Sequence, residues 1–296
     1  MTFFDGRGPV GVWLTRVGLV GAVEARAAAS EIERLGYGTL WIGEGANNKE
    51  VLSNAGILLA GTSTLAIATG IASIYARDPY AAKAGSEALG EAYPGRFLFG
   101  IGVSHARSVT ARGHEYAGPA SAMRAYLDGM DAADYRGPRA DPPVPLMLAA
   151  LRPRMLELAR DRSAGAHPYF TPVEHTRRAR AVLGEGPLLA PELMVVLDED
   201  PVSARAMART NMTPYLALPN YANNLLSLGY TEADLADGGS DRLVDDLIAW
   251  GSPAAIRARI REHLDAGADH VCIQPLAKTL ERAIADLDVL APVVLA

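Results

Sequence analysis

Short apolar runs alternate with amphipathic stretches along almost the whole chain. The apolar runs are rich in Val, Ile, Leu and Trp, which is typical of strands buried on both faces of a parallel sheet. Eight such runs are expected as strands, at residues 11–14, 39–43, 65–71, 96–103, 144–149, 164–167, 189–197 and 270–275. The run at 164–167 is the weakest of them.

The segments between these runs have the pattern of amphipathic helices. Helix starts are marked by a capping residue followed by proline at Asp200-Pro201 and Ser252-Pro253, and Gly36, Gly184 and Gly267 follow predicted helices. Eight alternating strand and helix units predict an α/β fold, a (β/α)8 TIM barrel, better than an open sheet.

We expect one domain over residues 1–296. Residues 211–250 are too many for one loop and have a helical pattern. We interpret this stretch as a helical insertion between strand seven and helix eight that covers the active-site face.

Composition excludes several classes of protein. The chain is 49% hydrophobic and 21% charged, as globular proteins are. Its net charge of -6 and the lack of a basic run argue against a nucleic-acid partner. No apolar run has the length of a membrane span, and the first ten residues do not resemble a signal peptide. A single cysteine, Cys272, permits no intrachain disulfide, and a cytoplasmic location is expected.

The candidate chemistry lies at the strand ends, because the catalytic groups of such barrels follow the carboxyl ends of the strands. His105 follows the fourth strand and can give or take a proton near neutral pH, or it can merely bond a loop. Glu44 follows the second strand. It either anchors the cofactor or acts as an acid/base group, or it is a carboxylate that caps a helix or is solvated. His167 and Tyr169 follow the sixth strand, and His167 either faces the substrate or fills space.

The turn formed by Ala149, Ala150, Leu151 and Arg152 precedes a predicted helix. Free N–H groups at a helix start can bind a phosphate, and Arg152 and Arg154 add positive charge there. The alternative is that Arg152 and Arg154 are simply two arginines that face the solvent.

Other motifs are incomplete. The six histidines lack the spacing of a zinc site, so no dedicated metal site is expected. The sequence around Ser104 half-resembles the nucleophile elbow of hydrolases, with Ala106 where a glycine belongs. A hydrolase would also need an acid and a histidine downstream, and Asp269-His270 is an unconvincing pair.

The strand ends resemble the luciferase-like superfamily, in particular its branch dependent on the deazaflavin coenzyme F420. The resemblance covers about residues 11–274. It is carried by these segments: Gly38-Thr39-Leu40-Trp41-Ile42-Gly43-Glu44, Ala68-Thr69-Gly70-Ile71, Ala76-Arg77-Asp78-Pro79, Pro94-Gly95-Arg96-Phe97, Gly102-Val103-Ser104-His105, Leu148-Ala149-Ala150, Gly165-Ala166-His167-Pro168-Tyr169, Pro219-Asn220-Tyr221 and Ala266-Gly267-Ala268-Asp269-His270-Val271.

The resemblance implies a role for each strand end. A non-proline cis peptide at Gly70-Ile71 would back the cofactor ring, with Glu44 near one edge of the ring. Val103, Ser104 and His105 would line the ring and its phosphate-bearing tail. The Ala149–Arg152 turn would receive the phosphate, although Arg152 stands where this branch usually has glycine.

The function implied is hydride transfer between F420 and a small organic molecule, by reduction of a C=C, C=N or C=O bond or by oxidation of an alcohol. His105 and Glu44 would be catalytic, and His167 and Tyr169 would face the substrate. Two alternatives stay open: an FMN-dependent monooxygenase of the same fold and a non-catalytic flavin-binding protein. The resemblance also makes a homodimer a possible assembly.

Overall fold

The computed structural model of the protein describes residues 2–296. Eleven strands are present: β1 (Val10–Trp13), β2 (Thr39–Ile42), β3 (Ala66–Thr69), β4 (Ala72–Ser73), β5 (Phe97–Gly102), β6 (Leu146–Leu148), β7 (Gly165–Ala166), β8 (Leu188–Leu189), β9 (Glu192–Val196), β10 (Ile248–Trp250) and β11 (Val271–Pro275).

Helices separate most of these strands. The helices are α1 (Ala22–Arg34), α2 (Val51–Leu59), α3 (Pro79–Ala92), α4 (Ala106–Ala111), α5 (Pro119–Ala132), α6 (Pro153–Arg162), α7 (Val173–Leu183), α8 (Pro201–Leu216), α9 (Pro219–Ser227), α10 (Glu232–Leu235), α11 (Asp241–Leu247), α12 (Pro253–Asp265) and α13 (Leu280–Val294).

The strands form one curled sheet in which every pairing is parallel. Ten of them follow the order β10-β9-β11-β1-β2-β3-β5-β6-β7-β8, and β4 pairs with β5. Only Ala190 and Pro191 separate β8 from β9. Because β8 pairs with β7 and β9 pairs with β11, this short link connects the two halves of the sheet through the chain. This α/β arrangement is consistent with the predicted TIM-barrel fold.

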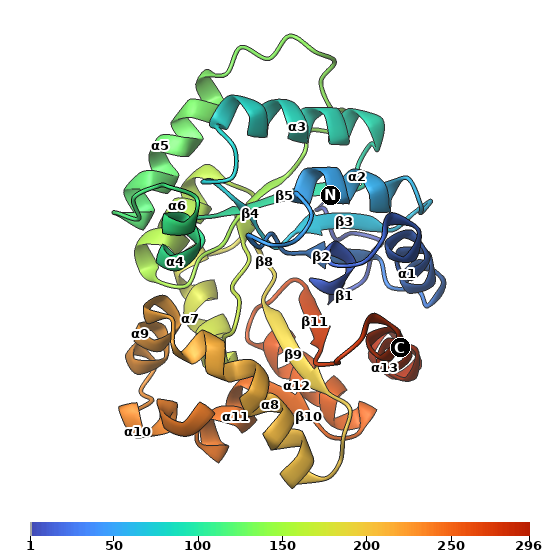
Figure 1. Ribbon diagram of the computed structural model, residues 1–296, viewed down its shortest axis with the longest axis vertical. Helices are drawn as coiled ribbons and strands as arrows, with labels where there is room; N and C mark the ends of the chain where they lie inside the picture. The colour runs from blue at the N-terminus through green and yellow to red at the C-terminus, as the bar shows by residue number, and fades with distance from the viewer. Residues whose placement is uncertain (1) are drawn as a thin grey trace.

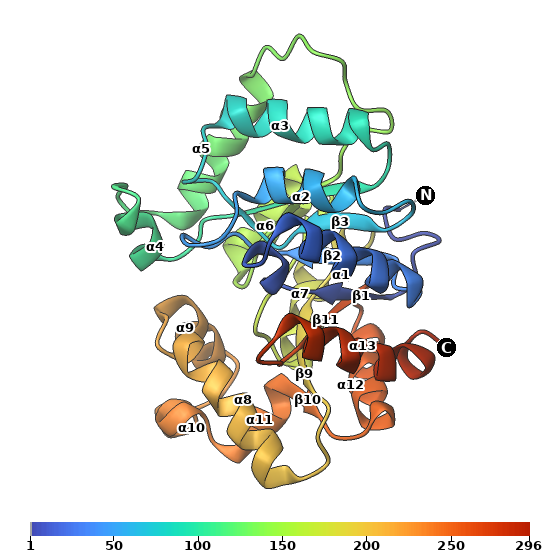
Figure 2. The same ribbon diagram turned by 45° about the vertical axis from the view of Figure 1, so that its right-hand side comes forward.

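Side-chain alternation divides the core into layers. From β5, Phe97, Phe99 and Ile101 pack into the large cluster shared with the helices, whereas Leu98 belongs to a separate cluster with Trp13. Glycines occupy the remaining inward positions of β5, because a Cβ atom on Gly100 would lie 2.0 Å from the Thr69 carbonyl oxygen. Figures 1 and 2 show the helices arranged around the sheet.

Two expectations about the C-terminal half need correction. The predicted strand at 189–197 is two strands, because Pro191 has no N–H to donate to a sheet ladder. The predicted helical stretch at 211–250 ends in a strand, β10, and residues 211–216 at its start lie inside α8. Helices α9, α10 and α11 fill half of it, while its description as an insertion stays an interpretation.

The predicted helix boundaries are largely confirmed. Proline occupies the first turn of α3, α6, α8 and α12, and the side chains of Asp200 and Ser252 cap α8 and α12. Gly36, Gly184 and Gly267 have positive φ angles directly after helices, where glycine is favoured. In residues 2–296, no helix combines the length and apolarity needed to cross a membrane.

Replacing Gly165 by alanine should destabilise the protein by about 1–3 kcal/mol, since overpacking in a close-packed sheet costs that much. A Cβ atom there would lie 2.0 Å from the Leu188 carbonyl oxygen, across the pairing of β7 with β8. Urea unfolding of Gly165→Ala measures the loss. Gly21→Ala is the control, because nothing lies within 4 Å of its Cβ position, and an equal loss in both variants would contradict the explanation.

Candidate functional site

His105 lies where β5 gives way to α4. Ser104 before it has a left-handed backbone (φ 57°), and His105 is the N-cap residue of α4. Its Nδ1 atom lies 3.2 Å from Oδ1 of Asn220 on α9, and its ring centroid is 5.4 Å from that of Tyr221. Figures 1 and 2 both place α4 and α9 on the same side of the molecule.

The protonation state of His105 follows from this environment. Burial lowers the pKa of His105 below its usual 6.5, and the hydrogen bond with Asn220 opposes that shift. The ring is therefore mostly neutral at pH 7. With Nδ1–H donated to the Asn220 oxygen, Nε2 carries the lone pair that can take up a proton.

Aromatic rings continue from His105 across the mouth of the curled sheet. Tyr221 is 6.2 Å from the ring of Tyr169, which is 5.2 Å from that of Trp13. The Tyr169 hydroxyl donates to Oε1 of Gln274 at 2.9 Å and lies 2.8 Å from the Tyr215 hydroxyl. The structure thus brings the predicted residues His105 and Tyr169 to one face of the molecule.

Glu44 lies at the same edge of the sheet, but its carboxylate is fully engaged. One oxygen accepts from the Ser73 amide at 2.7 Å and the other pairs with the Arg77 guanidinium, which also pairs with Glu50 at 2.6 Å. The Glu44 side chain is only 2% exposed. These contacts hold the end of β2 against β4, so Glu44 stabilises the backbone at this edge. Its catalytic role stays a prediction.

The peptide bond Gly70–Ile71 is cis, as the resemblance implies. It lies between β3 and β4, and the Ile71 side chain is within 2.7 Å of the Cβ position of Gly102. Gly70 itself lies against two ring nitrogens, because a Cβ atom there would be 2.6 Å from Trp13 Nε1 and 2.8 Å from His167 Nε2.

His167 is almost fully buried, with 1% of its surface exposed. Its Nδ1 atom lies 2.6 Å from the Ala190 carbonyl oxygen, and its ring is stacked 4.4 Å from that of Trp41. Burial lowers the pKa of His167 to about 4, so the ring is neutral at pH 7.

The predicted phosphate turn keeps its free donors. Among residues 2–296, no protein group accepts from the N–H groups of Ala150, Leu151 or Arg152, while the Leu151 oxygen accepts from His175 at 2.6 Å. Arg152 is exposed at the start of α6. Val103 packs partly buried against the large core cluster, so its side chain contributes to packing there.

The hydrolase alternative fails on geometry. Ser104 follows the carboxyl end of β5, whereas His270 precedes the amino end of β11 and bonds Thr39 at 2.8 Å. Asp269 pairs with Arg180 at 2.6 Å. Because the strands are parallel, Ser104 and His270 lie at opposite edges of the sheet.

Glu192 is a buried acid that sequence reasoning missed. Its Oε2 atom accepts from the Phe170 amide at 3.2 Å, and no group among residues 2–296 bonds Oε1. Burial raises the pKa of Glu192 to about 8, so the carboxyl is mostly protonated at pH 7. The available signal was a lone acidic residue in the apolar run 189–197.

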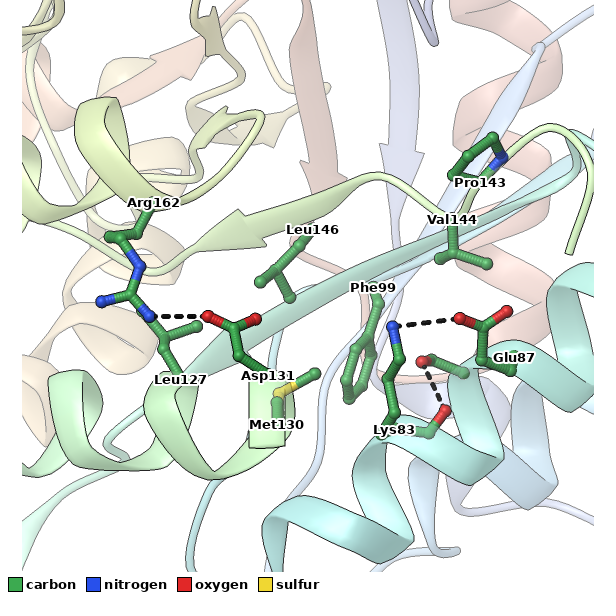
Figure 3. A pocket seen from close by; sticks show the side chains of 11 residues that line it. Lys83, Glu87, Phe99, Leu127, Met130, Asp131, Pro143, Val144, Leu146 and Arg162 are labelled. Atoms are coloured by element: carbon green, nitrogen blue, oxygen red, sulfur yellow. Dashed lines mark hydrogen bonds and ion pairs between the residues drawn. The ribbon is translucent and has the colours of Figure 1, made fainter. Parts of the chain in front are cut away.

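A cavity of about 140 Å³ lies elsewhere, between α3, α5 and the outer face of β5 (Figure 3). Apolar side chains such as Phe99 and Leu146 line it, and its charged groups are already paired, Lys83 with Glu87 and Arg162 with Asp131. None of the predicted site residues lines it. In the part of the chain that the structure describes, no three His, Cys, Asp or Glu residues are grouped as metal ligands.

Comparison with known proteins defines the class. The luciferase-like monooxygenase family model matches residues 11–270, and the chain belongs to this family. A 5,10-methylenetetrahydromethanopterin reductase of Methanolobus tindarius is 24% identical over 294 residues, covering 85% of this chain and 90% of that protein.

Two solved structures show the same fold. An F420-dependent secondary alcohol dehydrogenase in complex with an F420-acetone adduct has a TM-score of 0.76 at 15% identity, over 97% of this chain and 98% of its own. The oxygenating constituent of 3,6-diketocamphane monooxygenase from Pseudomonas putida, in complex with FMN, has a TM-score of 0.71 at 15% identity, over the same shares.

Replacing Glu192 by glutamine should change how stability depends on pH. The folded protein holds a proton on Glu192 up to about pH 8, whereas the unfolded chain releases it near 4.5. Wild-type stability therefore falls, relative to Glu192→Gln, as the pH rises from 5 to 8, by up to about 1.4 kcal/mol per pH unit. Urea unfolding at several pH values measures the difference. The exposed control Glu185→Gln should show no such trend, and a constant difference for Glu192→Gln would contradict the buried neutral acid.

Proposed function

We propose that the protein is an oxidoreductase that transfers a hydride between coenzyme F420 and a small organic substrate, on a closed (β/α)8 barrel whose α8–α11 segment covers the mouth. The observation that carries the proposal is the position of His105, half-buried at the end of β5 and opposite Asn220 and Tyr221 of α9. F420-dependent enzymes among the similar proteins support the choice of cofactor.

The residues at the mouth fit a flavin-type cofactor with a phosphate. The unused N–H groups of residues 150–152 and the exposed Arg152 offer donors to an anion at the start of α6. Tyr116 adds a ring near this turn, with its hydroxyl 3.5 Å from the Ser104 oxygen. When bound, a deazaflavin supplies a carbon that carries two electrons as a hydride.

His105 supplies the proton transfer in this proposal. Its neutral ring takes up a proton at Nε2, while Asn220 fixes the orientation of the ring through Nδ1. The other buried aromatic groups at the mouth exclude water, which strengthens each polar contact inside it.

An FMN-dependent monooxygenase is the second candidate. It is favoured by the likeness to the FMN complex of the camphane monooxygenase component. The same phosphate turn suits either cofactor, so the cofactor has to be measured. A non-catalytic flavin-binding protein would bind the cofactor without consuming its reduced form. The expected small-molecule substrate, cytoplasmic location and homodimer stay predictions.

Titration of the purified protein with F420 and, separately, with FMN tests the cofactor. We expect quenching of F420 fluorescence with a lower dissociation constant for F420 than for FMN. Arg152→Ala should raise the dissociation constant roughly 10–100-fold, as loss of a charge-assisted hydrogen bond does. The surface variant Arg136→Ala is the matched control. Tighter binding of FMN would contradict the proposal, and unchanged affinity in Arg152→Ala would remove the phosphate contact.

Replacement of His105 by alanine should lower turnover about 10²–10⁴-fold while leaving F420 affinity nearly unchanged, because general acid–base catalysis contributes that much. In the wild type, the rate that depends on neutral His105 should fall on the acid side, around a pKa below 6.5. The exposed His114→Ala is the control. An undiminished rate in His105→Ala would exclude this residue from the mechanism.

A further inference from the structure

A side-chain amide near the carboxyl end of β11 has donor capacity that the protein does not use. Gln274 is the only glutamine in the sequence. Its Oε1 atom accepts from the Tyr169 hydroxyl at 2.9 Å. Its Nε2 atom carries two hydrogens, and no group among residues 2–296 accepts from it.

The Nε2 atom is open to solvent. Gln274 is half-buried, and its Nε2 is not one of the buried polar atoms that lack a partner among residues 2–296. An atom that has no partner and is not buried is in contact with solvent. A ligand atom can therefore reach the amide nitrogen from outside.

The side chain of Gln274 faces the inside of the curled sheet. Two residues earlier on β11, Cys272 packs into the inner cluster that also holds Trp13, whereas Ile273 packs into the outer cluster with the helices. Because successive side chains of a strand alternate, Gln274 points to the same side as Cys272. Gln274 lies nearer the carboxyl end of β11 than the buried Cys272, so its amide opens at the mouth.

Two tyrosines fix which atom of the amide faces the mouth. The Tyr215 hydroxyl lies 2.8 Å from the Tyr169 hydroxyl, its one bonding partner among residues 2–296. When Tyr215 donates to Tyr169 and Tyr169 donates to Oε1 of Gln274, each hydroxyl hydrogen has an acceptor. The reversed amide would leave one of these hydrogens without a protein acceptor. The atom presented to a ligand is therefore Nε2, which can only donate.

A row of aromatic rings joins this amide to His105. The ring of Tyr169 is 6.2 Å from that of Tyr221, which is 5.4 Å from the ring of His105. Gln274 and His105 thus border the same mouth from β11 and from the end of β5. A group that can only donate matches a ligand oxygen that accepts, such as a carbonyl oxygen.

We infer that Nε2 of Gln274 donates a hydrogen bond to an oxygen of the substrate, which therefore belongs to the class of carbonyl compounds rather than of alkenes or imines without an acceptor oxygen. This inference rests on the proposed function for the identity of the ligand as a substrate. Gln274 binds and orients the substrate, Tyr169 and Tyr215 hold the amide in position, and proton transfer remains with His105.

The signal of a single amide tests the inference directly. Because the chain has one glutamine, protein made with glutamine labelled with nitrogen-15 in its side chain gives one pair of N–H signals. In protein saturated with oxidised F420, acetone, cyclohexanone or acetophenone should move one signal of the pair downfield saturably. Methylenecyclohexane, which has the shape of cyclohexanone without its oxygen, should cause no downfield shift.

Two variants separate the donor from the packing. Gln274→Glu at about pH 8, where the carboxyl is ionised, keeps an oxygen for Tyr169 and removes the donor. Gln274→Met keeps the length of the side chain and removes both groups. Each should weaken cyclohexanone binding about 3–10-fold in calorimetry, as loss of one hydrogen bond does, with F420 affinity unchanged. Asn223→Asp, on the exposed side of α9, is the matched control and should bind as the wild type does. If Gln274→Met does not fold, Gln274→Glu alone decides.

Three results would overturn the inference. The first is no amide shift with acetone, cyclohexanone or acetophenone. The second is full cyclohexanone affinity in Gln274→Glu. The third is an amide shift caused by F420 alone that prevents any response to ketones, which would assign the donor to the cofactor. If F420 does not bind at all, the proposed function fails, and titration of the free protein with the same ketones still tests the amide.

Discussion

Parallel pairing of the strands is the constraint on which the rest of the structure depends. It places the carboxyl ends of β1, β2, β3, β5, β6 and β7 on one edge of the sheet, although these strands come from distant parts of the chain. His105, Glu44 and the 150–152 turn share a face for this reason. The same constraint separates Ser104 from His270, which lie at opposite ends of their strands. The grouping of these residues at the mouth is therefore a consequence of strand direction.

Buried polar groups around the mouth fall into two kinds. The pair of Glu44 with Arg77 is fully satisfied, and it ties β2 to β4 next to the Gly70–Ile71 bond. Among residues 2–296, Glu192, Trp13 and His167 each keep a buried atom without a protein partner. Such atoms also occur away from the mouth, for example on Asn54 of α2 and His263 of α12. A buried atom without a partner therefore does not by itself mark a functional group.

Much of the fold followed from the sequence, because buried parallel strands and proline-started helices leave strong local patterns. The weak strand at 164–167 is β7, which holds only Gly165 and Ala166, and the close approach of Gly165 to β8 leaves no trace in the periodicity. The geometry of the candidate site was only partly predictable. The position of His105 at the end of a strand was predicted, whereas the Arg77 partner of Glu44 and the unpartnered nitrogen of Trp13 depend on side chains that meet only in three dimensions.

The break between β8 and β9 fixes the tautomer of a buried histidine through the backbone. Its carbonyl at Ala190 sets which nitrogen of His167 bears the hydrogen, and a backbone atom is not altered by exchanging neighbouring side chains. Residues on α8 and α9 can therefore vary in size while the hydrogen of the His167 ring stays on Nδ1. Substitutions near the break change the packing volume around the ring and leave its tautomer as it is.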